Sequence, residues 1–288
     1  MTNLTHNRAL LFMHVAALLF GLTGIFGKLA STTPDAIVLG RALLAVAALI
    51  AFARLGSHPL LRQLTPRHLA SLLMCGAFLA VHWLTFFHAI DISGVGIATL
   101  GFASFPAFVV VLEALFWREL PTRQDLVKVG LVCAGLLLIP AEFTLDADNT
   151  EGLLWAILSG FCFAALSVGN RLTSGHLHPV QIACWQSLVV SLLVLPTGTH
   201  ALMQMPALDW LWIGLLGVFC TGLAQVLFVS SLRVLNARTA SLFFALEPVY
   251  GILIAWWLFA EQPTLRMLIG GLLIISAVLM VRRAPTPA

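Results

Sequence analysis

The chain has 288 residues, of which 60% are hydrophobic and only 9% are charged, and its formal net charge at pH 7 is +3. A soluble domain normally carries about 25% charged residues, so this composition excludes a protein whose surface faces water throughout. The small net charge, without any run of Lys or Arg, also argues against nucleic-acid binding.

Ten apolar segments are long enough to cross a membrane as helices, because a bilayer core of about 30 Å takes about 20 helical residues. The first segment is too long for the apolar core of a signal peptide, so we expect it to be retained. The ten predicted spans are residues 9–30, 35–55, 67–89, 94–117, 124–141, 151–171, 179–199, 209–232, 237–259 and 264–282. This pattern predicts an all-α integral membrane protein with ten transmembrane helices.

The longest polar interruption, from Glu142 to Glu151, divides the spans into five plus five. Around it the chain repeats itself, because Pro106 and Glu119 align with Pro248 and Glu261 at an offset of 142 residues. The two aligned stretches share 8 identities in 25 positions. We therefore assign residues 1–145 to a first five-helix repeat and residues 146–288 to a second.

The basic residues of the connecting segments predict the orientation. With the N-terminus in the cytoplasm, twelve Lys or Arg residues lie on the cytoplasmic side and two, Lys28 and Arg266, lie opposite. Such a bias marks the cytoplasmic side of a membrane protein. The twelve are Arg8, Arg54, Arg62, Arg67, Arg118, Arg123, Lys128, Arg171, Arg233, Arg238, Arg282 and Arg283. We therefore expect both termini in the cytoplasm. Because each half has five spans, the second repeat enters the membrane from the opposite side, so we also expect inverted repeats, which can support alternating access.

The repeated segments FASFPAFVVVLEALFWRELPT and FALEPVYGILIAWWLFAEQPT resemble the segment that closes each half of EamA-type carriers, in the drug/metabolite transporter superfamily. The opening run LLFGLTGIFGKLA is similar to the first helix of that family, with Phe20 where tryptophan is common. The resemblance covers nearly the whole chain, and within the superfamily the chain looks like the amino-acid exporters of the YddG kind. It implies a ten-span carrier of the bacterial inner (plasma) membrane, with spans 1, 3, 4, 6, 8 and 9 around the cavity.

Two ionisable residues inside the spans are candidates for substrate contact, since a charge at mid-bilayer costs roughly 2.5–3.5 kcal/mol. Glu247 directly precedes Pro248, which leaves a backbone carbonyl free beside the carboxylate. It is expected to bind a substrate amine or a proton, or alternatively to be a helix-break acid paired with hydroxyls or Arg41. Arg41 is interpreted as a structural anchor that snorkels outward or pairs with an acid, with a substrate carboxylate as the alternative.

Spans 4 and 9 each contain a proline that is expected to bend the helix. Pro106 and Pro248 would let one end of the cavity close while the other opens. Glu113, in the inner third of span 4, is expected to form a structural pair with Arg118 or Arg123.

Polar and aromatic side chains at mid-depth complete the candidate site. His82 can bind a carboxylate or relay protons, or bond a backbone carbonyl. Thr23 lies in a small-residue stripe that is also typical of helix packing. Trp155 is alternatively an anchor at the membrane interface, and Gln225 alternatively forms a hydrogen bond between two helices. The predicted substrate-binding residues are Phe20, Thr23, His82, Phe86, Phe102, Phe105, Trp155, Ser159, Gln225, Glu247 and Tyr250.

The candidate residues describe a cavity lined by many aromatic side chains and few charged ones. Such a cavity predicts a small neutral or zwitterionic substrate rather than a polyanion. No metal or cofactor is expected, because HExxH, clustered acids and CxxC are absent and the five cysteines lie in apolar runs. A rival hypothesis is an intramembrane enzyme, but GxSxG is absent and His82 has no evident serine partner. We predict a secondary transporter that exports amino acids, with export of other metabolites or drugs as the alternative. The oligomeric state stays open, although one chain can enclose a site.

Overall fold

The computed structural model describes residues 4–56, 58–117, 121–138, 148–235, 240, 243 and 246–280, and the regular elements among them are all helices. Six of these helical segments are long and apolar enough to cross a membrane, and α4, α11 and α12 are shorter apolar helices. The elements are α1 (His6–Leu29), α2 (Pro34–Leu55), α3 (Pro66–Phe102), α4 (Phe105–Trp117), α5 (Arg123–Leu138), α6 (Asp148–Ser174), α7 (Pro179–Met203), α8 (Asp209–Gly217), η1 (Val218–Leu223), α9 (Ala224–Ser231), α11 (Glu247–Phe259) and α12 (Leu265–Leu279).

Several helices begin where the sequence carries a capping residue. Thr5, Thr33, Thr65 and Thr264 each accept a hydrogen bond from the backbone N–H three residues later. These threonines satisfy one of the free N–H groups at each helix start. Proline follows directly in α2 and α3, where its missing N–H costs nothing. The starts therefore lie within a few residues of the predicted spans.

The boundary between the third and fourth predicted spans differs from the prediction. α3 runs through it with a kink at Gly94, whose φ of 79° and ψ of 171° suit only glycine. The helix then breaks at Ala103 and Ser104, before α4 begins at Phe105. Pro106 has no N–H to donate to the carbonyl of Phe102, so the α-helical hydrogen bonds cannot continue there.

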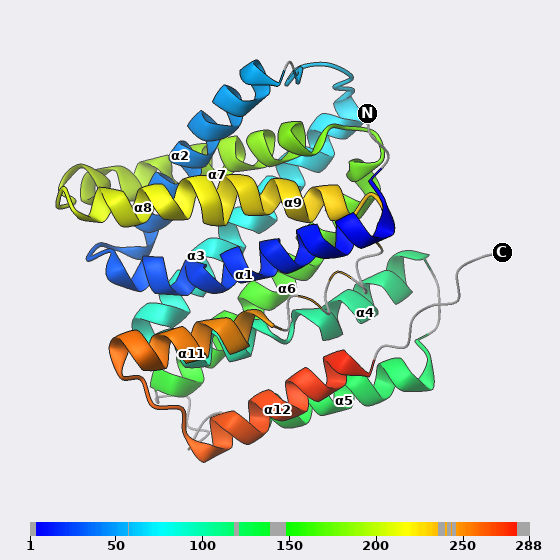
Figure 1. Cartoon of the computed structure of the whole chain (residues 1–288), viewed down its shortest axis with the longest axis vertical. Helices are drawn as coiled ribbons and strands as arrows, with labels where there is room; N and C mark the ends of the chain where they lie inside the picture. Colours follow the sequence, from blue (N-terminus) through cyan, green and yellow to red (C-terminus); the bar gives the residue numbers. More distant parts are fainter. Residues whose placement is uncertain are drawn as a thin grey trace.

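The helices form one bundle whose outer parts are two helix pairs. α2 packs against α7, and α5 packs against α12, on opposite sides of the bundle in Figure 1. Between the pairs, α1 lies along α8, α9 and α11, whereas α6 lies along α3 and α4. We call the end where α1 begins the near end and the end where α1 finishes the far end. The main hydrophobic core occupies the centre, between the two pairs.

Small residues on α1 allow its neighbours to approach closely. A Cβ at Gly27 would lie 2.2 Å from the ring of Phe87, and one at Gly21 would lie 2.9 Å from the Cβ of Tyr250. The small-residue stripe of α1 therefore packs against α3 and α11, as small residues commonly do between membrane helices.

Candidate functional site

Arg41 is the only arginine among the described residues that is fully buried, and it lies on α2. Its Nε donates to Thr221 Oγ1 at 2.8 Å, and its Nη2 donates to the carbonyl of Cys220 at 3.4 Å. The guanidinium also lies over the ring of Trp83, 4.1 Å from the centroid. Arg41 is therefore held inside the bundle, and the expectation that it snorkels outward is wrong.

The acceptors for Arg41 come from a π-helical turn. α8, η1 and α9 form one continuous segment, and the π turn covers Val218–Leu223. Thr221 donates its hydroxyl hydrogen to the carbonyl of Leu216 at 2.8 Å, so its oxygen lone pairs are available to Arg41. Such turns are rare in helices and are frequently found at functional sites. No residue pattern in this stretch predicted it.

Glu247 is the first residue of α11 and is 5% exposed. A carboxylate at a helix N-terminus is stabilised by the helix dipole. Glu247 also lies close enough to Arg41 for electrostatic attraction between the two side chains. One guanidinium nitrogen, Arg41 Nη1, and the hydroxyl of Thr23 make no hydrogen bond to the described residues. An acid, a cation with a free N–H group and a free hydroxyl are thus all buried in this region.

An aromatic cluster fills the centre of the bundle. Phe102 stacks on Phe105 with ring centroids 5.2 Å apart, and Phe163 stacks on Phe228 at 5.5 Å. His82 joins the cluster, with its ring 4.9 Å from that of Phe163. The cluster consists of Phe20, His82, Phe86, Phe102, Phe105, Phe163 and Phe228, from α1, α3, α4, α6 and α9.

The sequence prediction included five of these seven rings and missed Phe163 and Phe228. Each missed residue follows a predicted site residue at helical spacing, Phe163 four after Ser159 and Phe228 three after Gln225. Residues three or four apart share a helix face, so this spacing could have identified both.

His82 has a serine partner that the sequence did not reveal. Its Nδ1 lies 2.7 Å from Ser159 Oγ, and the serine hydroxyl also lies 3.1 Å from the carbonyl of His82. The expectation that His82 lacks a serine partner is therefore wrong. Because the two residues are 77 positions apart, only the packing of α3 against α6 brings them together.

Three buried amides form a chain across α6, α7 and α9. Gln225 Nε2 donates to Gln186 Oε1 at 3.2 Å, and Gln186 Nε2 donates to Asn170 Oδ1 at 2.6 Å. Gln225 therefore makes the expected helix-to-helix bond. Its Oε1 and Asn170 Nδ2 have no partner among the described residues. The second half of the chain thus places unpaired polar atoms in the interior.

Trp155 and Tyr250 lie outside the aromatic cluster. The indole of Trp155 donates to Glu151 at 3.2 Å and packs against His88 at the far end. Tyr250 is half-buried and contacts Gly21 where α11 meets α1. Neither contact is with the cluster, although both residues were predicted to line the same cavity.

An ion pair joins helices at each end of the bundle. At the far end, Lys28 of α1 pairs with Glu261, which follows α11, and Lys28 also lies 4.9 Å from the centroid of the Phe259 ring. At the near end, Arg171 of α6 donates to Glu113 of α4 at 2.7 Å. Glu113 thus pairs with Arg171, a partner that the sequence did not indicate, because α6 packs against α4.

Three predicted residues remain, of which Arg118 and the side chain of Pro248 lie outside the described part of the chain. Arg118, one of the expected partners of Glu113, is outside the described residues. Pro248 stands in the first turn of α11, and its side chain is likewise outside them. Pro106 is buried in the first turn of α4, directly after the helix break.

Comparisons with known proteins converge on one family. Residues 7–140 and 150–283 each match the EamA-like transporter family. An uncharacterized transporter of Archaeoglobus fulgidus is 29% identical over 196 residues, which are 68% of this chain and 70% of that protein. The uncharacterized transporter YxxF of Bacillus subtilis is 24% identical over 282 residues, 96% of this chain and 90% of that protein. A crystal structure with 18% identity matches with a TM-score of 0.70, covering 95% of this chain and 96% of its own, so the fold is shared.

Proposed function

Because the chain belongs to the EamA-like transporter family, we propose that it is a secondary carrier that works by alternating access. Its substrate is a small neutral or zwitterionic metabolite, and the first candidates are amino acids with aromatic or other apolar side chains, exported as by the YddG kind of carrier. The protein lies in the bacterial inner membrane with both termini in the cytoplasm. Ten spans arranged as two inverted repeats carry the movement.

The packing of the helices supports inverted repeats. α1, the first helix of one half, lies along α8, α9 and α11 of the other half. α6, the first helix of the second half, lies along α3 and α4 of the first. The two halves therefore exchange equivalent contacts, as expected for repeats related by a two-fold axis in the membrane plane. Among the described residues, Arg54, Arg62 and Arg233 lie at the near end, which fits a cytoplasmic near end.

The observation that carries the proposal is that Arg41 and Glu247 are both buried and that their side chains attract each other electrostatically. Arg41 retains a free N–H group that can receive a substrate carboxylate, and Glu247 can receive the substrate amine. Arg41 also lies over Trp83 and Phe87, whose neighbours in the chain, His82 and Phe86, belong to the aromatic cluster. A zwitterion bound here would direct its side chain toward apolar rings, which favours an aromatic or aliphatic amino acid.

Uptake into liposomes that contain the purified protein tests this function. The substrates are radiolabelled amino acids and metabolites, supplied with and without a proton gradient. Glu247→Gln should reduce transport strongly, whereas Glu113→Gln should reduce it less, because Glu113 is paired with Arg171 away from the cluster. Saturable counterflow identifies a carrier. Wild-type flux in both variants would remove Glu247 from the site, and the absence of flux with every substrate would reject the substrate class.

One observation favours a second candidate, an intramembrane enzyme. His82 and Ser159 are in hydrogen-bond contact, as a nucleophile and its base would be. However, Ser159 is 0% exposed, and its hydroxyl also contacts the backbone carbonyl of His82. Ser159→Ala separates the two functions in the same liposomes. Loss of lipid or peptide turnover in this variant, without counterflow in the wild type, would favour the enzyme.

A further inference from the structure

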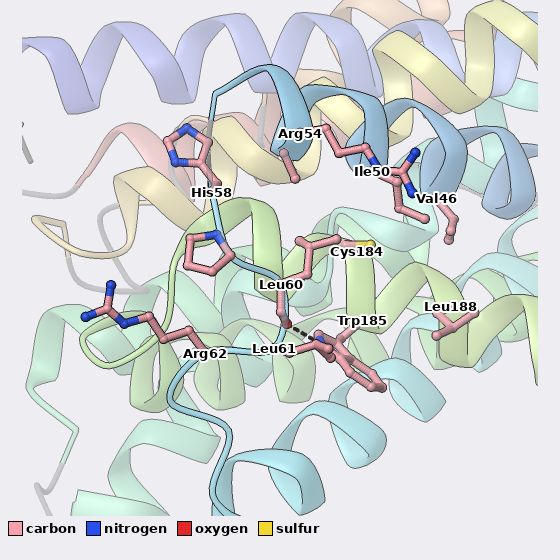
Figure 2. Close-up of a pocket in the computed structure, with 12 residues that line it drawn as sticks. Val46, Ile50, Arg54, His58, Leu60, Leu61, Arg62, Cys184, Trp185 and Leu188 are labelled. Atoms are coloured by element: carbon pink, nitrogen blue, oxygen red, sulfur yellow. Dashed lines mark hydrogen bonds between the residues drawn. The ribbon is translucent and has the colours of Figure 1, made fainter.

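An apolar groove of about 770 Å³ opens at the near end, between α2 and α7. Figure 2 shows His58 and Arg62 on one side of this groove and Leu188 on the other. Its apolar lining comes from both helices and from the connection between α2 and α3. The apolar lining includes Val46, Ile50, Leu61, Cys184, Trp185 and Leu188.

The connection that covers part of the groove is held in place by side chains of α7. Trp185 Nε1 and Gln181 Nε2 each donate to the carbonyl of Leu60 at 2.9 Å, and Gln181 also donates to the carbonyl of Arg62 at 2.9 Å. The indole bond is drawn in Figure 2. Two α7 side chains thus satisfy the backbone of the connection, so the groove has a fixed wall.

Positively charged side chains line the groove, with His58 and Arg62 at one end and Arg54 beside Ile50 (Figure 2). Arg54, His58 and Arg62 line the groove, and a second hollow of about 830 Å³ shares His58 and Arg62 and adds Arg233. Neither hollow has Asp or Glu among its described lining residues. Burial, and then the charges of His58 and Arg233, lower the pKa of His178 to about 4. The position therefore favours a negatively charged ligand.

We propose that this groove binds an anionic phospholipid, with an acyl chain along the apolar lining and the headgroup phosphate at Arg62, at the end where His58 lies. The shape and charge agree with this occupant, because a chain of CH₂ groups needs an apolar wall and a phosphate needs cations at one end. Arginine suits a phosphate because its guanidinium can donate two parallel hydrogen bonds. Basic pockets beside membrane helices bind anionic headgroups in this way. The proposal goes beyond transport and does not depend on the transported substrate.

Quenching of Trp185 by brominated lipid tests the proposal in the full-length protein. The protein is placed in phosphatidylcholine nanodiscs that contain equal fractions of either brominated phosphatidylglycerol or brominated phosphatidylcholine. The Trp185 signal is the difference from Trp185→Phe, in which Gln181 still holds Leu60. We expect brominated phosphatidylglycerol to quench Trp185 at a several-fold lower fraction than brominated phosphatidylcholine. A cation close to an anionic lipid contributes about fivefold to binding, so Arg62→Gln should weaken the preference about fivefold.

Matched variants separate the groove from general membrane attraction. The double variant Arg54→Gln/Arg62→Gln should abolish the preference, whereas Arg67→Gln, an exposed arginine that lines neither hollow, should retain it. Val46→Phe should reduce quenching by filling the groove, and Leu192→Phe, exposed elsewhere on α7, should not.

Three results would overturn the proposal. The first is equal quenching by the two brominated lipids, and the second is an unchanged preference in the Arg54→Gln/Arg62→Gln protein. The third is displacement of the lipid by free glycerol phosphate at the same concentration, because this would identify a soluble phosphate as the ligand and leave the apolar groove without a role.

Discussion

Replacing Lys28 with methionine should open the far end of the bundle more often. Lys28 of α1 pairs with Glu261, and the two side chains are 35% and 24% exposed. A partly exposed ion pair contributes about 0.5–1 kcal/mol after screening by water. The contact of Lys28 with the ring of Phe259 adds about 0.5–1 kcal/mol. If the proposed carrier opens at this end by breaking these contacts, their loss removes about 1–2 kcal/mol, which corresponds to a factor of about 5–30 in the ratio of closed to open forms.

Thiol labelling at Thr23 measures this ratio. Thr23 lies one helical turn beyond Phe20 on the same face of α1, between the aromatic cluster and the ion pair. It is 5% exposed in the structure, so a cysteine there reacts mainly in the open form. In a cysteine-free protein carrying Thr23→Cys, a membrane-impermeant maleimide added at the far end should react about 5–30 times faster after Lys28→Met.

A second ion pair provides the control. Lys128 and Asp125 lie three residues apart on α5, so their pair joins no two helices. Lys128→Met should leave the labelling rate of the Thr23→Cys protein within twofold. If Lys28→Met also leaves the rate unchanged, the ion pair does not hold the far end closed. If Lys128→Met accelerates labelling equally, the effect reflects lost charge rather than a lost contact between α1 and α11.

Two further predictions concern stability. Gly94→Ala should lower the midpoint of thermal unfolding in detergent, because a φ of 79° strains alanine by about 1–3 kcal/mol. Gly214→Ala is the control and should not lower the midpoint, because Gly214 lies in a helix and a Cβ there would meet nothing within 4 Å. Equal midpoints for the two variants would contradict backbone strain at Gly94. His178→Asn keeps a side chain that can cap α7 at Val180. Burial first, and then His58 and Arg233, lower the pKa of His178 to about 4, so the folded form favours the neutral ring and loses stability as pH falls from 6.5 to 4. The Asn variant should lose less over this window, and identical pH profiles would contradict the assignment.

The sequence predicted where many of the helices start because the signals for a helix start are local. Apolar runs and prolines near span starts, such as Pro34 and Pro66, act within a few residues, so they indicate where a helix starts. The same holds for His82, Phe86, Phe102 and Phe105, whose apolar or mid-span positions indicated the interior. Predictions from these features do not depend on how the helices pack against one another.

Contacts between distant helices could not be predicted in this way. Arg41 meets Thr221 across 180 positions, and Glu113 meets Arg171 across 58. In both cases the sequence identified the charged residue, but it did not reveal that Arg41 lies inside the bundle or that Glu113 contacts Arg171. The π turn that supplies Thr221 is a backbone feature with no residue signature. Packing therefore determined the partners, and the sequence alone did not contain a local signal for them.

The position of α1 also has a consequence for how the protein is made. Its main neighbours α8, α9 and α11 belong to the second half, and Ser231 donates to the carbonyl of Ala9 across 222 positions. At about 5–20 residues per second of synthesis, α1 spends roughly 10–40 s in the bilayer before these helices emerge. During that time Gly21, which packs against Tyr250 of α11 in the finished bundle, faces lipid or another protein. Assembly is therefore completed late, and a ribosome that stalls in the second half leaves an α1 that insertion factors or membrane proteases can recognise.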